Sequence, residues 1–279
     1  MKNFEFMPYD RVVGVQPDWQ EETERLLAAY YAEHGTSVIE GFELEKTQRD
    51  KEIIKFAEDA VSAYLRAYGR EPKFDVPLEK IHFLRDGGTK EFTQGKLGGG
   101  AHATKFGSML VDRSDSDIQT ALITFHELFH TKSYSALQIT TPDMEGVKKL
   151  EAYRNGFTVT SRDGREEYFH DFEEAVISLM TKRFYDEEIS QNETFKKELD
   201  SGCMPDMSRT KEAGGLSGLV DDIWNSNRDS YSSREQVMDI FIKAQIDGNL
   251  LPVARLVEST YGEGSFRELG EITGRKVED

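Results

Sequence analysis

Two histidines and a glutamate in the segment His126–His130, which reads HELFH, are the residues of this chain best suited to chemistry. On a helix, residues four positions apart differ by about 40° around the axis, so both imidazoles point the same way and reach one metal ion. Glu127 follows the first histidine and lies near the same spot, where a carboxylate can take a proton from a metal-bound water. This spacing predicts a metal site that activates water for hydrolysis.

The alternative is a fortuitous match in which the two histidines are ordinary buried residues. Because the 279 residues include only six histidines, such a match is expected in on the order of one chain in a hundred. The flanking sequence also predicts a buried helix, with Asp115 or Asp117 capping its beginning. The apolar positions of this helix are Ala121, Leu122, Phe125, Leu128 and Phe129. The metal site is therefore the favoured interpretation.

Composition limits the classes of protein that remain. With 37% hydrophobic and 31% charged residues, the chain is typical of globular proteins of one large domain or two lobes. No apolar run approaches the roughly 20 residues of a membrane span, and the first residues do not resemble a signal peptide, so we expect a cytoplasmic protein. The single cysteine, Cys203, excludes an intrachain disulfide and a cysteine-rich zinc site. The net charge of −17 argues against nucleic acid and anionic membranes as partners.

Hydrophobic periodicity and turn residues predict the elements that must position the histidines. The expected helices span 44–68, 171–185, 233–244, 250–258 and 265–272, with a further one between Asp18 and Gly35. The expected strands and extended segments span 80–85, 107–112, 150–160 and 165–169, the last two paired about a turn at 161–164. The segments 131–142 and 201–218 are expected to be irregular.

Two histidines do not complete a catalytic zinc site, because zinc there takes three protein ligands and leaves one position for water. One known solution adds a histidine six residues after the second, but that position is Ala136 here, and Ser133 replaces the glycine of the same pattern. Another solution is a glutamate on a later helix packed antiparallel to the first, and the segment 172–178 offers one. The residues alone leave the choice open among Glu173, Glu174, His170 and Asp171.

The HELFH segment and the downstream Glu174-Ala175 together resemble the gluzincin branch of the zincin metallopeptidases, the thermolysin-like group, over roughly residues 107–185. The resemblance implies that His126 and His130 are zinc ligands, that Glu127 is the general base and that Glu174 is the third ligand. Ser178 departs from the pattern, because the family has an acid there that supports a ligand histidine. A serine hydroxyl is a weaker acceptor for an imidazole N–H.

The resemblance also implies a fold and an activity. The fold would be α+β and zincin-like, with a small mixed or antiparallel sheet, the active-site helix and a mainly helical C-terminal part. The expected subdomains are residues 1–133 and 134–279, with the active-site cleft between them. The protein would bind one zinc ion per chain and hydrolyse peptide bonds in a peptide or protein substrate.

Two further features of such enzymes can be matched to this sequence. The strand expected over 107–112 would lie along the cleft rim and pair with the substrate main chain. Tyr231 is the expected donor that stabilises the oxyanion, with Tyr153 and His170 as alternatives. Other functions remain open: a metal-containing, zincin-like binding or regulatory protein with little or no hydrolysis, or a helical interaction module in which HELFH is fortuitous.

Overall fold

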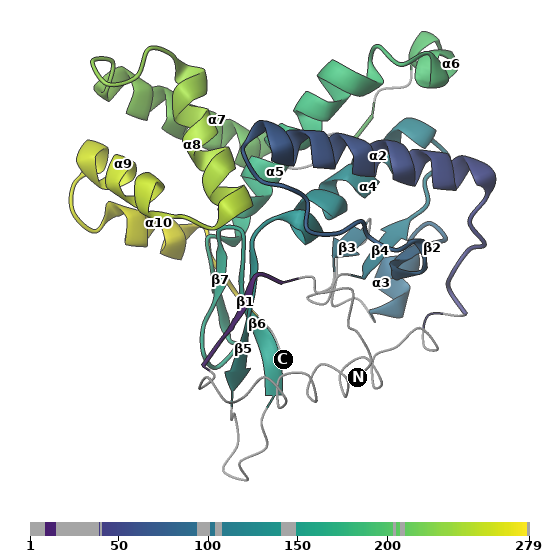
Figure 1. Cartoon of the computed structure of the whole chain (residues 1–279), viewed down its shortest axis with the longest axis horizontal. Helices are drawn as coiled ribbons and strands as arrows, with labels where there is room; N and C mark the ends of the chain where they lie inside the picture. Colours follow the sequence, from purple (N-terminus) through teal and green to yellow (C-terminus); the bar gives the residue numbers. More distant parts are fainter. Residues whose placement is uncertain are drawn as a thin grey trace.

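The computed structural model describes residues 9–14, 39, 41–93, 101–103, 108–140, 149–202, 205–206 and 210–277, and these form a mixed α+β structure with two sheets (Figure 1). The α+β class predicted from the sequence is therefore confirmed. The helix expected between Asp18 and Gly35, and Cys203, lie outside the described residues. In the described part of the chain, no helix is both long and apolar enough to cross a membrane.

A three-stranded sheet lies on the right of Figure 1. Its strands, in spatial order, are β2 (Ile81–Leu84), β4 (Met109–Asp112) and β3 (Ala101–Ala103). β2 and β4 run parallel and are buried along their whole length, which is why their sequences are apolar runs, whereas β3 pairs antiparallel with β4. Both predicted strands are confirmed, but the expectation that segment 107–112 forms the rim was wrong, because β4 lies between β2 and β3. Among the described strands, β3 is at the edge of this sheet.

A second sheet has six strands, and its only parallel pair is β1 with β5 among the described strands. In spatial order the strands are β1 (Arg11–Val13), β5 (Ser135–Thr140), β6 (Lys149–Asn155), β7 (Thr158–Thr160), β8 (Glu166–Tyr168) and β9 (Arg275–Lys276). The predicted pairing about residues 161–164 is confirmed. The segment 150–160 is itself a hairpin, because Gly156 at φ +48° allows a tight turn.

The irregular connection expected over 131–142 was wrong, because it contains β5. This strand is held between β1 and β6, so partners distant in sequence determine its conformation.

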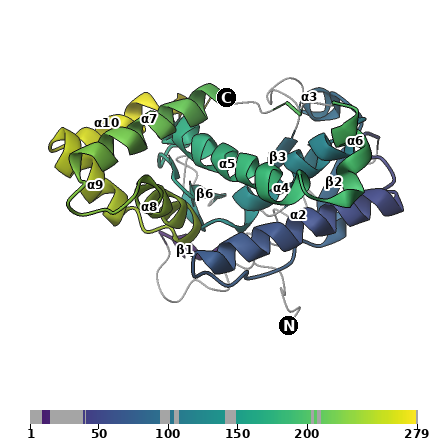
Figure 2. The same cartoon turned by 90° about the horizontal axis from the view of Figure 1, so that it is seen from above.

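Three helices form the centre of the molecule: α2 (Gln48–Ala67), α4 (Asp117–Lys132) and α5 (His170–Phe184). Figure 2 shows α4 between α2 and α5. The rings of Phe125 and Phe184 stack with centroids 4.3 Å apart and join α4 to α5 in the hydrophobic core. The predicted helices 44–68 and 171–185 are confirmed, and α2 begins later than expected because Thr47 and Asp50 form a capping box.

The C-terminal helices gather on the left of Figure 1. They are α7 (Thr210–Ser226), α8 (Arg234–Asp247), α9 (Leu251–Tyr261) and α10 (Ser265–Ile272). α8, α9 and α10 confirm the helices predicted over 233–244, 250–258 and 265–272. The irregular stretch expected over 201–218 was wrong from Thr210 onward, because Leu216, Val220 and Ile223 repeat at helical spacing and are buried in the core.

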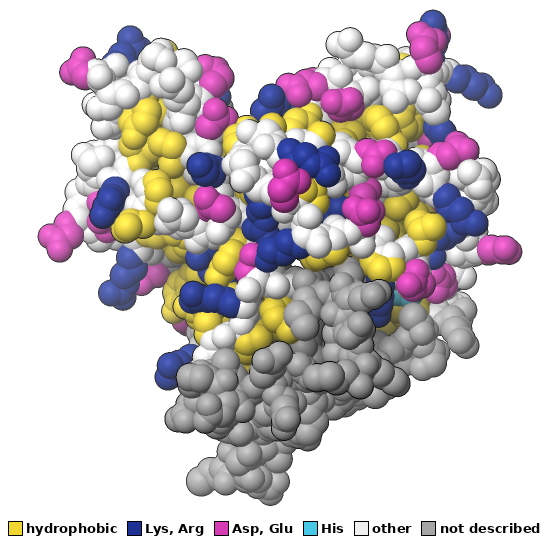
Figure 3. Space-filling view, in the orientation of Figure 1, with side chains coloured by type: hydrophobic (Ala, Val, Ile, Leu, Met, Phe, Trp, Pro, Cys, Tyr) yellow, Lys and Arg dark blue, Asp and Glu magenta, His cyan; other side chains and the backbone are white. Residues whose placement is uncertain are grey.

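Short helical elements lie between the larger ones. They are η2 (Leu78–Lys80), α3 (Gly88–Phe92), η3 (Tyr185–Ile189), η4 (Glu193–Phe195) and α6 (Lys196–Asp200). On the face seen in Figure 3, acidic and basic side chains are interspersed over the described residues.

The beginning of α5 is held by α10. The N–H of Phe169 donates to the carbonyl of Gly270 over 3.0 Å, and the N–H of Asp171 donates to the carbonyl of Thr273 over 2.8 Å. Phe169 has a positive φ of 62° and packs its ring against Phe266 and the bare Cα of Gly270. The C-terminal helix therefore satisfies N–H groups that the first turn of α5 would otherwise leave unpaired.

Replacing Gly270 with alanine is expected to lower the free energy of unfolding by about 1–3 kcal/mol, because the added Cβ would overpack this contact. That Cβ would come within 2.5 Å of the Phe169 ring. Gly214→Ala is the matched control, since Gly214 is also helical and a Cβ there meets nothing within 4 Å. The control should be neutral or stabilising by roughly 0.4–1 kcal/mol. Urea unfolding of both variants measures the difference, and equal midpoints would contradict the prediction.

Candidate metal centre

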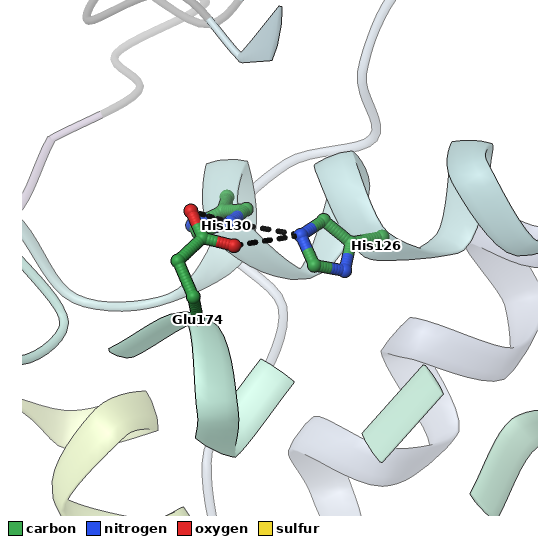
Figure 4. A group of neighbouring side chains, drawn as sticks. All are labelled: His126, His130 and Glu174. Atoms are coloured by element: carbon green, nitrogen blue, oxygen red, sulfur yellow. Dashed lines mark hydrogen bonds and ion pairs between the residues drawn. The ribbon is translucent and has the colours of Figure 1, made fainter. Parts of the chain in front are cut away.

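Helices α4 and α5 bring together His126, His130 and Glu174, whose side chains point toward one another (Figure 4). The Nε2 atoms of the two histidines are 3.2 Å apart, and they lie 3.2 Å and 3.4 Å from the two carboxylate oxygens of Glu174. A tetrahedral zinc ion with bonds of about 2.0–2.1 Å holds its ligand atoms about 3.3 Å apart. These three residues therefore fit zinc in both donor type and spacing.

Side-chain hydrogen bonds at the beginning of α4 fix where this helix starts. Ser116, rather than Asp115 or Asp117, is the N-cap, and its hydroxyl accepts the N–H of Gln119 over 3.0 Å. The carboxylate of Glu198, from α6, accepts the N–H of Asp117 over 2.9 Å and the hydroxyl of Ser116 over 2.7 Å. A negative charge at this end also suits the helix dipole. The cap predicted from the sequence was thus one residue away from the observed one.

Glu173, which the sequence also allows as the third ligand, lies on the other side of His130. Its Oε1 is 3.1 Å from the Nδ1 of His130, and its Oε2 accepts the N–H of Thr158 over 3.0 Å. A carboxylate that binds the Nδ1–H of a ligand histidine fixes the tautomer and leaves the Nε2 lone pair for the metal. Asp171 is exposed at the start of α5, and His170 lies one turn before Glu174, so neither joins the ligand group.

The hydroxyl of Thr181 faces the Nδ1 of His126, as the carboxylate of Glu173 faces the Nδ1 of His130. This hydroxyl lies 3.3 Å from the Nδ1 of His126 and donates to the carbonyl of Ile177 over 2.9 Å. Because its single hydrogen is used there, the hydroxyl accepts from the Nδ1–H of His126. The gluzincin pattern places this role at Ser178 instead. Position 181 is seven residues after Glu174, on the same face of α5 two turns later, and this spacing is the signal in the sequence that points to Thr181.

In the metal-free cluster, His130 and Glu174 carry opposite charges. Burial lowers the pKa of His130, but the nearby carboxylates of Glu174 and Glu173 outweigh it and hold this pKa well above 6.5. Burial raises the pKa of Glu174, but the imidazoles of His130 and His126 outweigh it and hold this pKa well below 4.5. Without metal, the cluster is therefore a buried ion pair at neutral pH.

Zinc uptake at pH 7 is expected to release at least about one proton per ion, because a metal must displace the proton that His130 holds. The sign follows from the raised pKa of His130: zinc affinity falls as pH falls. In the metal-free protein the same proton stabilises the fold, fully below pH 6.5 and less as pH rises through the raised pKa. Calorimetric titration in two buffers of different ionisation enthalpy measures the release, and a value near zero would rule the ion pair out.

Glu127 is buried on α4 and does not belong to the ligand group. It lies about 60° around the helix axis from His130, on a neighbouring strip of the helix. This position is the one expected for a residue that acts on a metal-bound water without binding the metal.

Tyr231, the expected oxyanion donor, is not brought to this cluster. It precedes α8, whose residue Gln245 contacts Glu173 near the other end. The rise from the N-cap Ser233 to Gln245 is about 18 Å, which is longer than a tyrosine side chain.

Tyr153 and His170 were the other expected donors, and they occupy different elements. Tyr153 lies within β6, whereas His170 shares a face of α5 with Glu174. Burial and the charge of Arg275 lower the pKa of His170, so its imidazole is neutral at pH 7.

No protein-family model, curated protein or solved structure matches this chain. The gluzincin resemblance and the two subdomains therefore stay predictions, and a proposal of function depends on the chemistry of the site alone.

Proposed function

We propose that the protein is a zinc-dependent peptidase of the zincin type, with one zinc ion per chain. The observation that carries the proposal is the convergence of two Nε2 atoms and one carboxylate at the spacing of a tetrahedral zinc ion. A further support is that the Nδ1 atom of each histidine faces its own acceptor, which leaves both Nε2 lone pairs toward the ion.

His126, His130 and Glu174 would hold the zinc, which supplies a Lewis acid for the substrate carbonyl and lowers the pKa of a bound water toward about 7. Glu127 accepts the proton of the attacking water and delivers it to the departing amine. Glu173 and Thr181 keep the two imidazoles in the ligating tautomer throughout. His170, neutral and on the Glu174 face of α5, is the better candidate than Tyr231 for a donor to the oxyanion.

The edge strand β3 supports a peptide as substrate. Among the described strands, β3 pairs with β4 alone, and it packs against α4. An edge strand presents unpaired N–H and C=O groups, to which an extended peptide can add as a further strand. A peptide bound there would lie next to the helix that carries Glu127 and both histidines.

A second candidate is a metal-containing binding or regulatory protein of the same type with little or no hydrolysis. The observation that favours it is that the Nδ1 of His126 faces the hydroxyl of Thr181, which is a weaker acceptor than a carboxylate. Zinc would then have a structural role, and recognition would depend on the edge strand.

Two measurements test the proposal. Elemental analysis of the purified chain should give close to one zinc per chain, and a peptide library should be cleaved by the zinc-loaded protein but not after chelation. Zinc without cleavage of any peptide would support the binding protein instead. Absence of zinc even after incubation with excess metal would overturn both candidates.

A further inference from the structure

The side-chain amide of Gln245, near the end of α8, is fully buried beside the metal centre, with 0% of the residue exposed. Its Oε1 accepts the N–H of Phe157 over 3.0 Å, and its Nε2 donates to Oε1 of Glu173 over 3.1 Å. A backbone N–H can only donate, so Phe157 fixes which end of the amide is the oxygen. The amide therefore turns a donor, and never an acceptor, toward Glu173.

Glu173 is consequently held from three sides. It is 2% exposed and interacts with the Gln245 amide, the N–H of Thr158 and the Nδ1 of His130. The first two donors come from α8 and β7, so contacts outside α5 also fix the position of this carboxylate. A carboxylate fixed in this way has one orientation from which to accept the Nδ1–H of His130.

Gly156 leaves room for the Gln245 amide, and a backbone hydrogen bond joins Gln245 to the segment after α4. A Cβ on Gly156 would come within 2.0 Å of the Gln245 Nε2, so only glycine fits that turn of the β6–β7 hairpin. The backbone carbonyl of Gln245 accepts the N–H of Tyr134, two residues beyond α4, over 3.4 Å. Gln245 thus links three segments that meet at His130: the end of α4, the hairpin turn and the start of α5.

We propose that Gln245 is a positioning residue of the metal centre, acting through Glu173 to hold His130 in the orientation and tautomer that bind the ion. This inference rests on the proposed function only in that the cluster binds zinc. It assigns to α8, 72 residues beyond Glu173 in the sequence, a direct part in metal affinity.

The test compares Gln245→Met with Gln138→Met. Gln138 is a matched control, because it is 4% exposed and its Nε2 donates to the carbonyls of Ala152 and Ser161 over 3.2 Å and 3.3 Å. Gln245→Met is expected to weaken zinc binding, measured against a chromophoric chelator, by about 10–100-fold, the usual effect of losing an outer hydrogen-bond partner. It should also change the visible absorption of the cobalt-substituted protein. Gln138→Met should keep zinc affinity within about threefold and leave the cobalt spectrum unchanged.

A double-mutant cycle separates this role from a purely structural one. If Gln245 only stabilises the hairpin, Gln245→Met weakens zinc binding as much in a Glu173→Gln background as in the wild type, and the positioning role is overturned. If Gln245 acts through Glu173, Gln245→Met causes less than about a twofold further loss in that background, because both act through one carboxylate.

The possible outcomes separate the positioning role of Gln245 from the proposed function. Equal zinc affinity of the two methionine variants overturns the positioning role and leaves the proposed function intact. Zinc binding with the expected losses, but without peptide cleavage, overturns the proposed function and leaves the positioning role intact. Failure of the wild-type chain to bind zinc overturns both.

Discussion

Exchange of Glu127 for glutamine is expected to reduce the turnover of a peptide substrate by about 10²–10⁴-fold, the usual contribution of a general acid–base residue. The amide has nearly the shape of the carboxylate but cannot accept the proton of the attacking water. Zinc binding should be unchanged, because Glu127 lies outside the group formed by His126, His130 and Glu174. The expected signature is therefore a loss of kcat with normal metal content.

The measurement is the initial rate of cleavage of a library-derived peptide, with zinc content determined on the same sample. Glu52→Gln is a suitable control, because Glu52 is an exposed residue of α2 that forms an ion pair with Arg49, away from the cluster. It should retain the wild-type rate. A Glu127→Gln variant that cleaves within tenfold of the wild type would show that another residue is the base.

The parts of the site that follow local spacing can be predicted from the sequence. His126 and His130 meet because they are four apart on a helix, and the apolar residues around them mark that helix without any knowledge of the fold. The prediction of Glu174 as the third ligand needs one more assumption, namely that a later helix packs across the helix of the two histidines. The length of the intervening chain permits this packing. Choosing between Glu173 and Glu174 requires the rotation of α5 about its axis, which tertiary packing sets.

The supporting contacts depend on tertiary structure and could not be predicted. Gln245 reaches Glu173 across 72 positions, and no periodicity relates the two. The prediction of Tyr231 as oxyanion donor also depended on tertiary structure, because a position just before a helix does not indicate which end of that helix faces the site. β5 was missed for a similar reason: its strand conformation depends on β1 and β6, which pair with it on either side.

Substitution of Glu174 and of Glu173 tests which of the two is the carboxylate ligand, and a large loss of zinc affinity is expected for Glu174. Glu174→Gln should weaken zinc binding by more than about 100-fold, because a neutral amide oxygen replaces a charged ligand, which is a larger change than losing an outer partner. Glu173→Gln should lose only about 10–100-fold, since it alters the partner of the His130 Nδ1 and leaves three ligands in place. The two variants make the same chemical change at adjacent residues, so each controls for the other.

The metal-free proteins should differ as well. In Glu174→Gln the buried imidazolium of His130 loses the partner that chiefly raises its pKa, and removing one member of a buried ion pair typically costs about 3–5 kcal/mol. His130 can shed its proton in response, so the loss of stability should be greatest below pH 6.5 and shrink as pH rises. Chelator competition and urea unfolding at two pH values measure both effects. If Glu173→Gln instead loses more zinc affinity than Glu174→Gln, the carboxylate ligand is Glu173, and α5 binds the ion in a different rotation about its axis.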